Sequence, residues 1–152
     1  MYGLQNEQVQ TKDSLEMADW KAYKSDEHEF EFQYPGDLQP YGCPLKSCIA
    51  FGHIRDAHND NRIYSFTVFD YGSHVAQQNN GQEVIMAGQV ANYEQEEQVF
   101  SLDTGYTVDN ITKIYSLEKN GKTYQINVQF DKNNHQDEVL AEKMLSTFKF
   151  TR

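Results

Sequence analysis

The sequence predicts an α+β domain in which an antiparallel β-sheet is flanked by helices. Three observations lead to this fold class. Apolar and polar residues alternate early in the chain, an Asn-Gly pair separates two further alternating segments, and an apolar stripe with helical spacing lies near the C-terminus. The 152 residues suffice for one domain, which we expect to span residues 19–152 after a flexible linker over residues 1–18.

The first predicted strand ends at Tyr34. Phe30, Phe32 and Tyr34 alternate with polar residues, so three aromatic rings point to one face of the strand. Residues 35–37 predict a turn, because proline removes a ladder donor and glycine frees the backbone. The next strand is expected over residues 47–53.

The middle of the chain predicts further strands and one short helix. Residues 63–71 carry β-branched and aromatic residues on both faces, which is typical of an interior strand covered on two sides. Ser73 is expected to cap a short helix over residues 74–79, since its hydroxyl can accept a hydrogen bond from an orphan amide. Residues 83–93 could be helical by spacing, but the internal Gly88 and the flanking turn residues favour two short strands.

The clearest local prediction is a hairpin around Asn120 and Gly121. Both central residues of a type I′ turn need a positive φ, which asparagine and glycine tolerate. Pairing Lys119 with Lys122 then places nearly all apolar residues of the two strands on one face. The pairs on this face are Leu117 with Tyr124, Tyr115 with Ile126, Lys113 with Val128 and Ile111 with Phe130.

A final helix is predicted over residues 137–147. An apolar stripe with helical spacing runs along it and comprises Leu140, Met144 and Phe148, with Ala141 and Leu145 beside them. We expect this stripe to pack on the sheet.

Four motifs, in this order along the chain, resemble those of PsbP-like bacterial exported proteins and lipoproteins. They are WKAY at 20–23 with FEFQYPGD at 30–37, AGQVA at 87–91, EKNGKTY at 118–124, and MLSTFKF at 144–150. The resemblance spans about residues 20–151. It implies an α/β/α sandwich with the sheet between helices, export from the cytoplasm, and usually no established catalytic activity.

Charge and hydropathy limit the partners. The net charge of −10 would repel a polyanion, so nucleic acid and anionic membrane surfaces are poor partners. No apolar run approaches the roughly 20 residues that cross a bilayer. The N-terminal residues lack the features of a signal peptide and a lipid-accepting cysteine, so we expect an export signal or tether upstream of this sequence. The expected location is extracytoplasmic: secreted, periplasmic or surface-anchored.

Cys43 and Cys48 are separated by four residues, which differs from the spacing of thioredoxin-like motifs and zinc knuckles. A disulfide that closes this small loop is expected, and it would stabilise the fold by about 2 kcal/mol on a chain-entropy estimate. Two reduced, partly buried thiols and a metal site remain as alternatives.

The richest group of potential metal ligands is His53, Asp56, His58 and Asp60, whose imidazoles and carboxylates suit a divalent transition ion. The spacing of Asp56, His58 and Asp60 imitates the start of a calcium loop, but Asn61 stands where glycine is needed and Thr67 where the bidentate glutamate should be. A solvated polar loop is therefore the favoured interpretation of this segment.

The sequence shows no local motif for nucleophilic catalysis and no phosphate-binding glycine loop, so no cofactor is expected. We therefore expect a non-catalytic binding or interaction module whose ligand, a protein or a small molecule, the sequence does not specify. The alternative is a divalent-cation-binding protein or a metal-dependent enzyme that uses the loop over residues 53–60.

Overall fold

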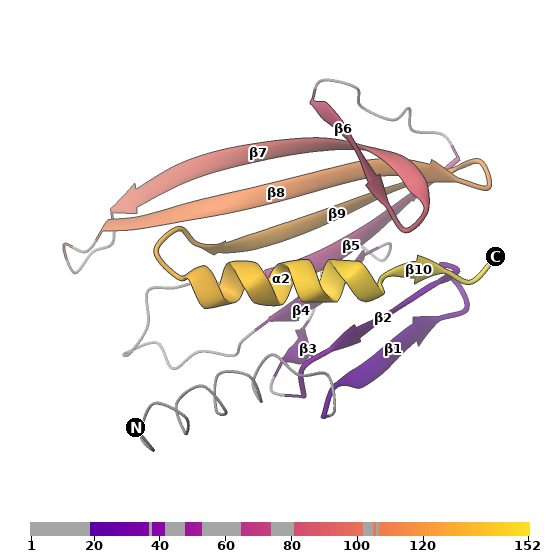
Figure 1. The fold of residues 1–152 in the computed structure, drawn as a ribbon, viewed down its shortest axis with the longest axis horizontal. Coiled ribbons are helices and arrows are strands. Elements are labelled where there is room, and N and C mark those ends of the chain that lie inside the picture. The colour runs from indigo at the N-terminus through magenta and orange to yellow at the C-terminus, as the bar shows by residue number, and fades with distance from the viewer. Residues whose placement is uncertain are drawn as a thin grey trace, which may run out of the picture.

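Two antiparallel sheets and one helix make up the part of the chain that the computed structural model describes, which is residues 19–36, 38–41, 48–52, 65–73, 81–101, 105 and 107–152 (Figure 1). The larger sheet has the strand order β3-β4-β5-β9-β8-β7-β6, and the smaller has the order β1-β2-β10. The elements are β1 (Lys21–Ser25), β2 (Phe30–Tyr34), β3 (Gln39–Tyr41), β4 (Cys48–Gly52), β5 (Ser65–Gly72), β6 (Gln82–Met86), β7 (Gln89–Ser101), β8 (Thr107–Lys119), β9 (Lys122–Asp131), α2 (His135–Thr147) and β10 (Lys149–Phe150).

The predicted Asn-Gly hairpin is the β8–β9 ribbon. Asn120 and Gly121 have φ values of 55° and 79°, as a type I′ turn requires. Lys119 lies opposite Lys122, and all four predicted apolar-face pairs are present in the register. The expected register is therefore confirmed.

The middle strands agree with the sequence in type but differ in detail. β5 lies in the sheet interior between β4 and β9, as expected. Only one of its faces is fully buried, with Phe66 and Val68, whereas Thr67 and Phe69 on the other face are half-buried. β6 and β7 are the two expected strands, but β7 is 13 residues long and pairs with β8 from Ala91 to Ser101. The helix expected over residues 74–79 lies outside the described residues.

The C-terminal helix α2 is confirmed, and it begins two residues earlier than predicted. Asn134 caps it, because the Asn134 side-chain oxygen accepts a hydrogen bond from the Asp137 amide at 3.1 Å. Ala141, Met144 and Leu145 are buried, so the predicted stripe faces the protein interior. No helix in the described part of the chain is long and apolar enough to cross a membrane.

The helix and the small sheet cover the same face of the large sheet (Figure 1). Phe148, just after α2, stacks on Phe30 of β2 with ring centroids 5.2 Å apart. Phe32 of β2 in turn contacts Phe66 and Phe51 of the large sheet at 5.0 and 5.4 Å. The α+β class and the antiparallel sheet are thus confirmed, with α2 as the one helix in the described residues.

Strand β1 was not predicted. Its residues are mostly exposed, so the alternation that marks β2 is weak there. Backbone pairing holds it in place, with Lys21 opposite Tyr34 and Ser25 opposite Phe30.

A buried polar cluster ties the β1–β2 turn to the large sheet. The Asp70 carboxylate lies 2.8 Å from His28 Nδ1 and 3.0 Å from Lys122 Nζ, and it also accepts a hydrogen bond from the Gly72 amide. Burial alone would raise the pKa of Asp70, but these hydrogen bonds together hold the pKa below its ordinary value. The Tyr124 hydroxyl completes the link by donating to the His28 carbonyl oxygen at 2.7 Å.

We predict that Asp70→Asn lowers the free energy of unfolding by about 2 kcal/mol, because buried His28 and partly buried Lys122 lose a charged acceptor. The lowered pKa means that the carboxylate stabilises the fold at pH values above its unfolded pKa, and that this contribution is lost as the pH falls through the folded pKa. Urea unfolding at neutral and acidic pH measures both effects. Asp26→Asn, on an exposed side chain, is the matched control. A variant as stable as the wild type at neutral pH would contradict this role for Asp70.

Candidate functional site

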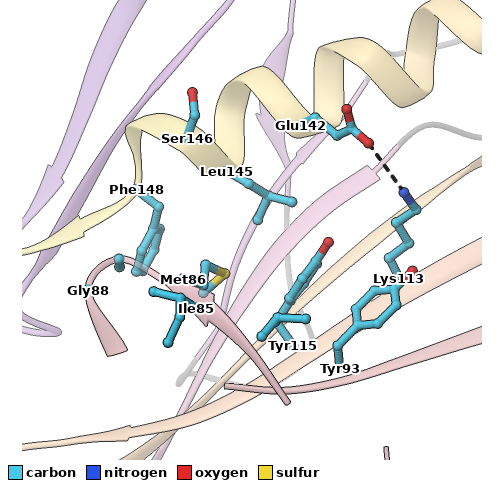
Figure 2. Close-up of a pocket in the computed structure, with 12 residues that line it drawn as sticks. Ile85, Met86, Gly88, Tyr93, Lys113, Tyr115, Glu142, Leu145, Ser146 and Phe148 are labelled. Carbon is cyan, nitrogen blue, oxygen red and sulfur yellow. Dashed lines mark ion pairs between the residues drawn. The ribbon is translucent and has the colours of Figure 1, made fainter. Parts of the chain in front are cut away.

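A groove of about 610 Å³ lies between the β6–β7 hairpin and the C-terminal half of α2. Its apolar wall comes from both sides: Val84 and Met86 belong to β6, Leu145 belongs to α2, and Phe148 follows the helix. Figure 2 shows the helix on one side of this space and the strands on the other. The groove is large enough for a small ligand or a short stretch of polypeptide.

Glycines position the hairpin beside the helix. Ala87 and Gly88 form the tight turn between β6 and β7, and both have a positive φ. At the other end of β6, the Gly81 amide donates to Asn92 Oδ1 at 2.9 Å. A Cβ atom at Gly81 would collide with the Tyr93 carbonyl oxygen, so this close approach requires glycine.

Two tyrosines from adjacent strands line the groove beside each other (Figure 2). The rings of Tyr93 and Tyr115 have centroids 5.0 Å apart, and the Tyr93 hydroxyl donates to Gln95 Oε1 at 2.8 Å. Burial, with the neighbouring Tyr93 and Glu142, raises the pKa of Tyr115 to about 12. Burial also raises the pKa of Tyr93. Both phenols are therefore protonated at neutral pH, and they offer aromatic surface and hydroxyl groups to a ligand.

Lys113 is the cation at the mouth of the groove. Its ammonium lies 3.7 Å from Glu142 on α2 (Figure 2). It also lies 3.2 Å from Glu138 on the same helix and 5.8 Å from the centre of the Phe130 ring. The side chain is 10% exposed. Lys113 thus links β8 to the helix. With two carboxylates against one ammonium, the mouth keeps an excess of negative charge.

The lining of the groove suits contact with an organic ligand. The wall is largely apolar and aromatic, with a few polar groups at the mouth, as in many sites for organic ligands. Lys113 is engaged by two carboxylates, and the raised pKa values of the two tyrosines keep their hydroxyl groups protonated at neutral pH.

Of the candidate site residues singled out in the sequence, the structure describes only Cys48, which does not line the groove. Cys48 is the first residue of β4 and is buried, but Cys43 lies outside the described residues, so the disulfide stays a prediction. The four metal-ligand candidates, His53, Asp56, His58 and Asp60, also lie outside the described residues. Within the residues that are described, no three side chains of the metal-binding types come together.

Sequence reasoning missed the groove, although one signal for it was present. Lys113 is the single charged residue among the four predicted pairs on the apolar face of the β8–β9 hairpin. A charged residue at a core position is usually paired or lies at a site. The sequence could not show that β6 and β7 bend toward the helix at this point.

The fold and the groove define an α+β domain in which a sheet hairpin and a helix enclose a ligand-sized space. No protein-family model matches the sequence, and no curated protein sequence matches it. A crystal structure of a Bacteroides thetaiotaomicron protein is similar with a TM-score of 0.62 and 10% identity, covering 88% of this chain and 49% of that protein. The chain therefore spans about half the length of that protein.

Cyanobacterial PsbP (CyanoP) from Synechocystis sp. PCC 6803 is also similar in structure. The TM-score is 0.46 and the identity is 14%, over 89% of this chain and 94% of CyanoP. At these identities the comparisons concern the fold alone.

We predict that Lys113→Glu lowers the free energy of unfolding by about 2 kcal/mol, because three carboxylates would then meet at one point. Lys113→Met should lower it by less than about 1 kcal/mol, since methionine keeps the packing on Phe130 and the two glutamates can turn to water. Thermal and urea unfolding compare the two variants. Equal losses would contradict the expected repulsion among three carboxylates at this position.

Proposed function

We propose that the protein is a non-catalytic binding module and that the groove between the β6–β7 hairpin and α2 is its binding site. One observation carries the proposal: a space of about 610 Å³ lined by Met86, Leu145, Phe148 and two protonated tyrosines. Apolar and aromatic surface of this kind, with hydrogen-bonding groups near it, gains free energy when a ligand displaces water.

We also propose that the module works outside the cytoplasm. The expected Cys43–Cys48 disulfide supports this, because disulfides persist in oxidising compartments. The resemblance to exported PsbP-like proteins supports it as well. We further propose that a second helical layer covers the far face of the large sheet, which would complete an α/β/α sandwich. The half-buried Phe69 and Ile114 on that face support this proposal.

We predict that the neutral dye N-phenyl-1-naphthylamine fluoresces on binding in the groove, because its rings match the apolar wall in polarity. Ser146→Trp should weaken this binding by about ten-fold or more, since an indole at this exposed position on the groove would fill the space. Lys143→Trp is the matched control, because Lys143 is exposed on the same helix and does not line the groove. Fluorescence titration gives both affinities.

The proposal would be wrong if Ser146→Trp bound the dye as tightly as the wild type while retaining its melting temperature.

The same pair of variants also serves to capture ligands from the native source. A molecule that is retained by the wild type and by Lys143→Trp, and lost by Ser146→Trp, identifies the natural ligand.

A further inference from the structure

The two ends of the large sheet differ in how their outer edges are protected. β3, at one end, is three residues long and contains Pro40, which has no backbone donor. β6, at the other end, is five residues long with the sequence QEVIM. Proteins usually protect an edge strand with proline, lysine, a bulge or a cover. β6 contains neither proline nor lysine, and no other described strand pairs with its outer side.

The register defines which backbone groups of β6 point outward. Met86 lies opposite Gln89 across a two-residue turn, so these two residues bond to each other. Alternation then directs the backbone groups of Val84 toward β7 as well, and those of Ile85 and Glu83 away from it. The outer edge thus offers the N–H and C=O groups of Ile85 and Glu83 to another strand.

Both faces of this edge carry apolar side chains. Val84 and Met86 point into the groove. On the opposite face, Ile85 is 73% exposed and lies directly across from Val90, which is 54% exposed. Isolated exposed apolar residues are common, but here two of them are adjacent on an open edge. A strand placed beside β6 would find apolar surface on both of its own faces.

Charge indicates the composition of that strand. Glu83 is exposed on β6 itself, and Glu138 and Glu142 lie at the mouth of the groove, where Lys113 offsets only one of them. The whole chain carries a net charge of −10. A second copy of this chain would bring the same negative charge to the edge. A segment with lysine or arginine beside apolar residues is complementary to it.

We propose that the groove receives an extended segment of another polypeptide, with alternating apolar and basic residues, that pairs with β6 as an added strand. This inference rests on the proposed function, because it names the occupant of the same groove. Strand addition is a common form of peptide recognition, in which the backbone provides affinity and side-chain pockets provide specificity. About five residues, or about 17 Å of extended chain, would match β6.

The test uses the full chain and a synthetic peptide of about seven residues with alternating valine and lysine. Isothermal titration calorimetry should detect binding. The same peptide with every internal amide N-methylated keeps its side chains but has no internal backbone N–H donors. We expect its affinity to fall by about ten-fold or more. A peptide with glutamate in place of lysine should lose affinity to a similar extent, because the edge and the groove mouth are acidic.

Two variants of one residue test the edge from the protein side. Ile85→Pro removes the outward N–H and leaves the hydrogen bonds between β6 and β7. It should therefore lower the affinity for the valine-lysine peptide by about ten-fold or more. Ile85→Thr keeps that N–H and removes part of the exposed apolar surface, so it should lower the affinity for this peptide by clearly less than Ile85→Pro does. Circular dichroism checks that both variants are folded, and the N-methylated peptide tests pairing without any change to the protein.

Each contrary result has a distinct meaning. Equal affinity for the normal and N-methylated peptides would overturn strand pairing, and equal affinity for the glutamate peptide would overturn the charge complementarity. A homodimer that Ile85→Pro dissociates would show that a second copy occupies the edge, which overturns the partner proposed here. If the peptide does not bind while the dye binds normally, this inference alone is wrong. If Ser146→Trp weakens the binding of neither the dye nor the peptide, the proposed function is wrong too.

Discussion

The interlock of aromatic rings between β2 and the large sheet is the constraint on which the rest of the structure depends. Phe30 and Phe32 are each 1% exposed, and they lie between Phe148 at the end of α2 and the rings of Phe51 and Phe66. Burial of large rings is a major source of stabilisation in a domain of this size. Because β2 and the end of α2 share this core, the small sheet and the helix are held against the same face of the large sheet.

The groove is a consequence of that placement. The aromatic core holds the C-terminal end of α2, and the Ala87–Gly88 turn brings β6 beside it. Lys113 then links β8 to the helix through two glutamates. The space between the helix and β6 is therefore bounded by regular secondary structure on both sides.

Local sequence was most informative where one short segment carries the whole signal. Asn120 and Gly121 predicted both the β8–β9 turn and its register, because turn chemistry and alternation agree there. The α2 stripe was equally clear. β1 was missed because backbone pairing with β2 holds its exposed residues, and the length of β7 was missed because its polar run pairs along β8. The groove was missed, apart from the unusual position of Lys113.

The amino-acid sequence by itself determined the type of most elements, the register of the central hairpin and the buried stripe of the helix, because these depend on the side-chain periods of two and of about 3.6 residues. Tertiary structure decided which strands lie at the sheet edges, that α2 and β2 cover the same face, and that Asp70 meets His28 and Lys122. These arrangements join residues far apart in the chain through packing and sheet curvature. No local period encodes them, so the site they create appears only in three dimensions.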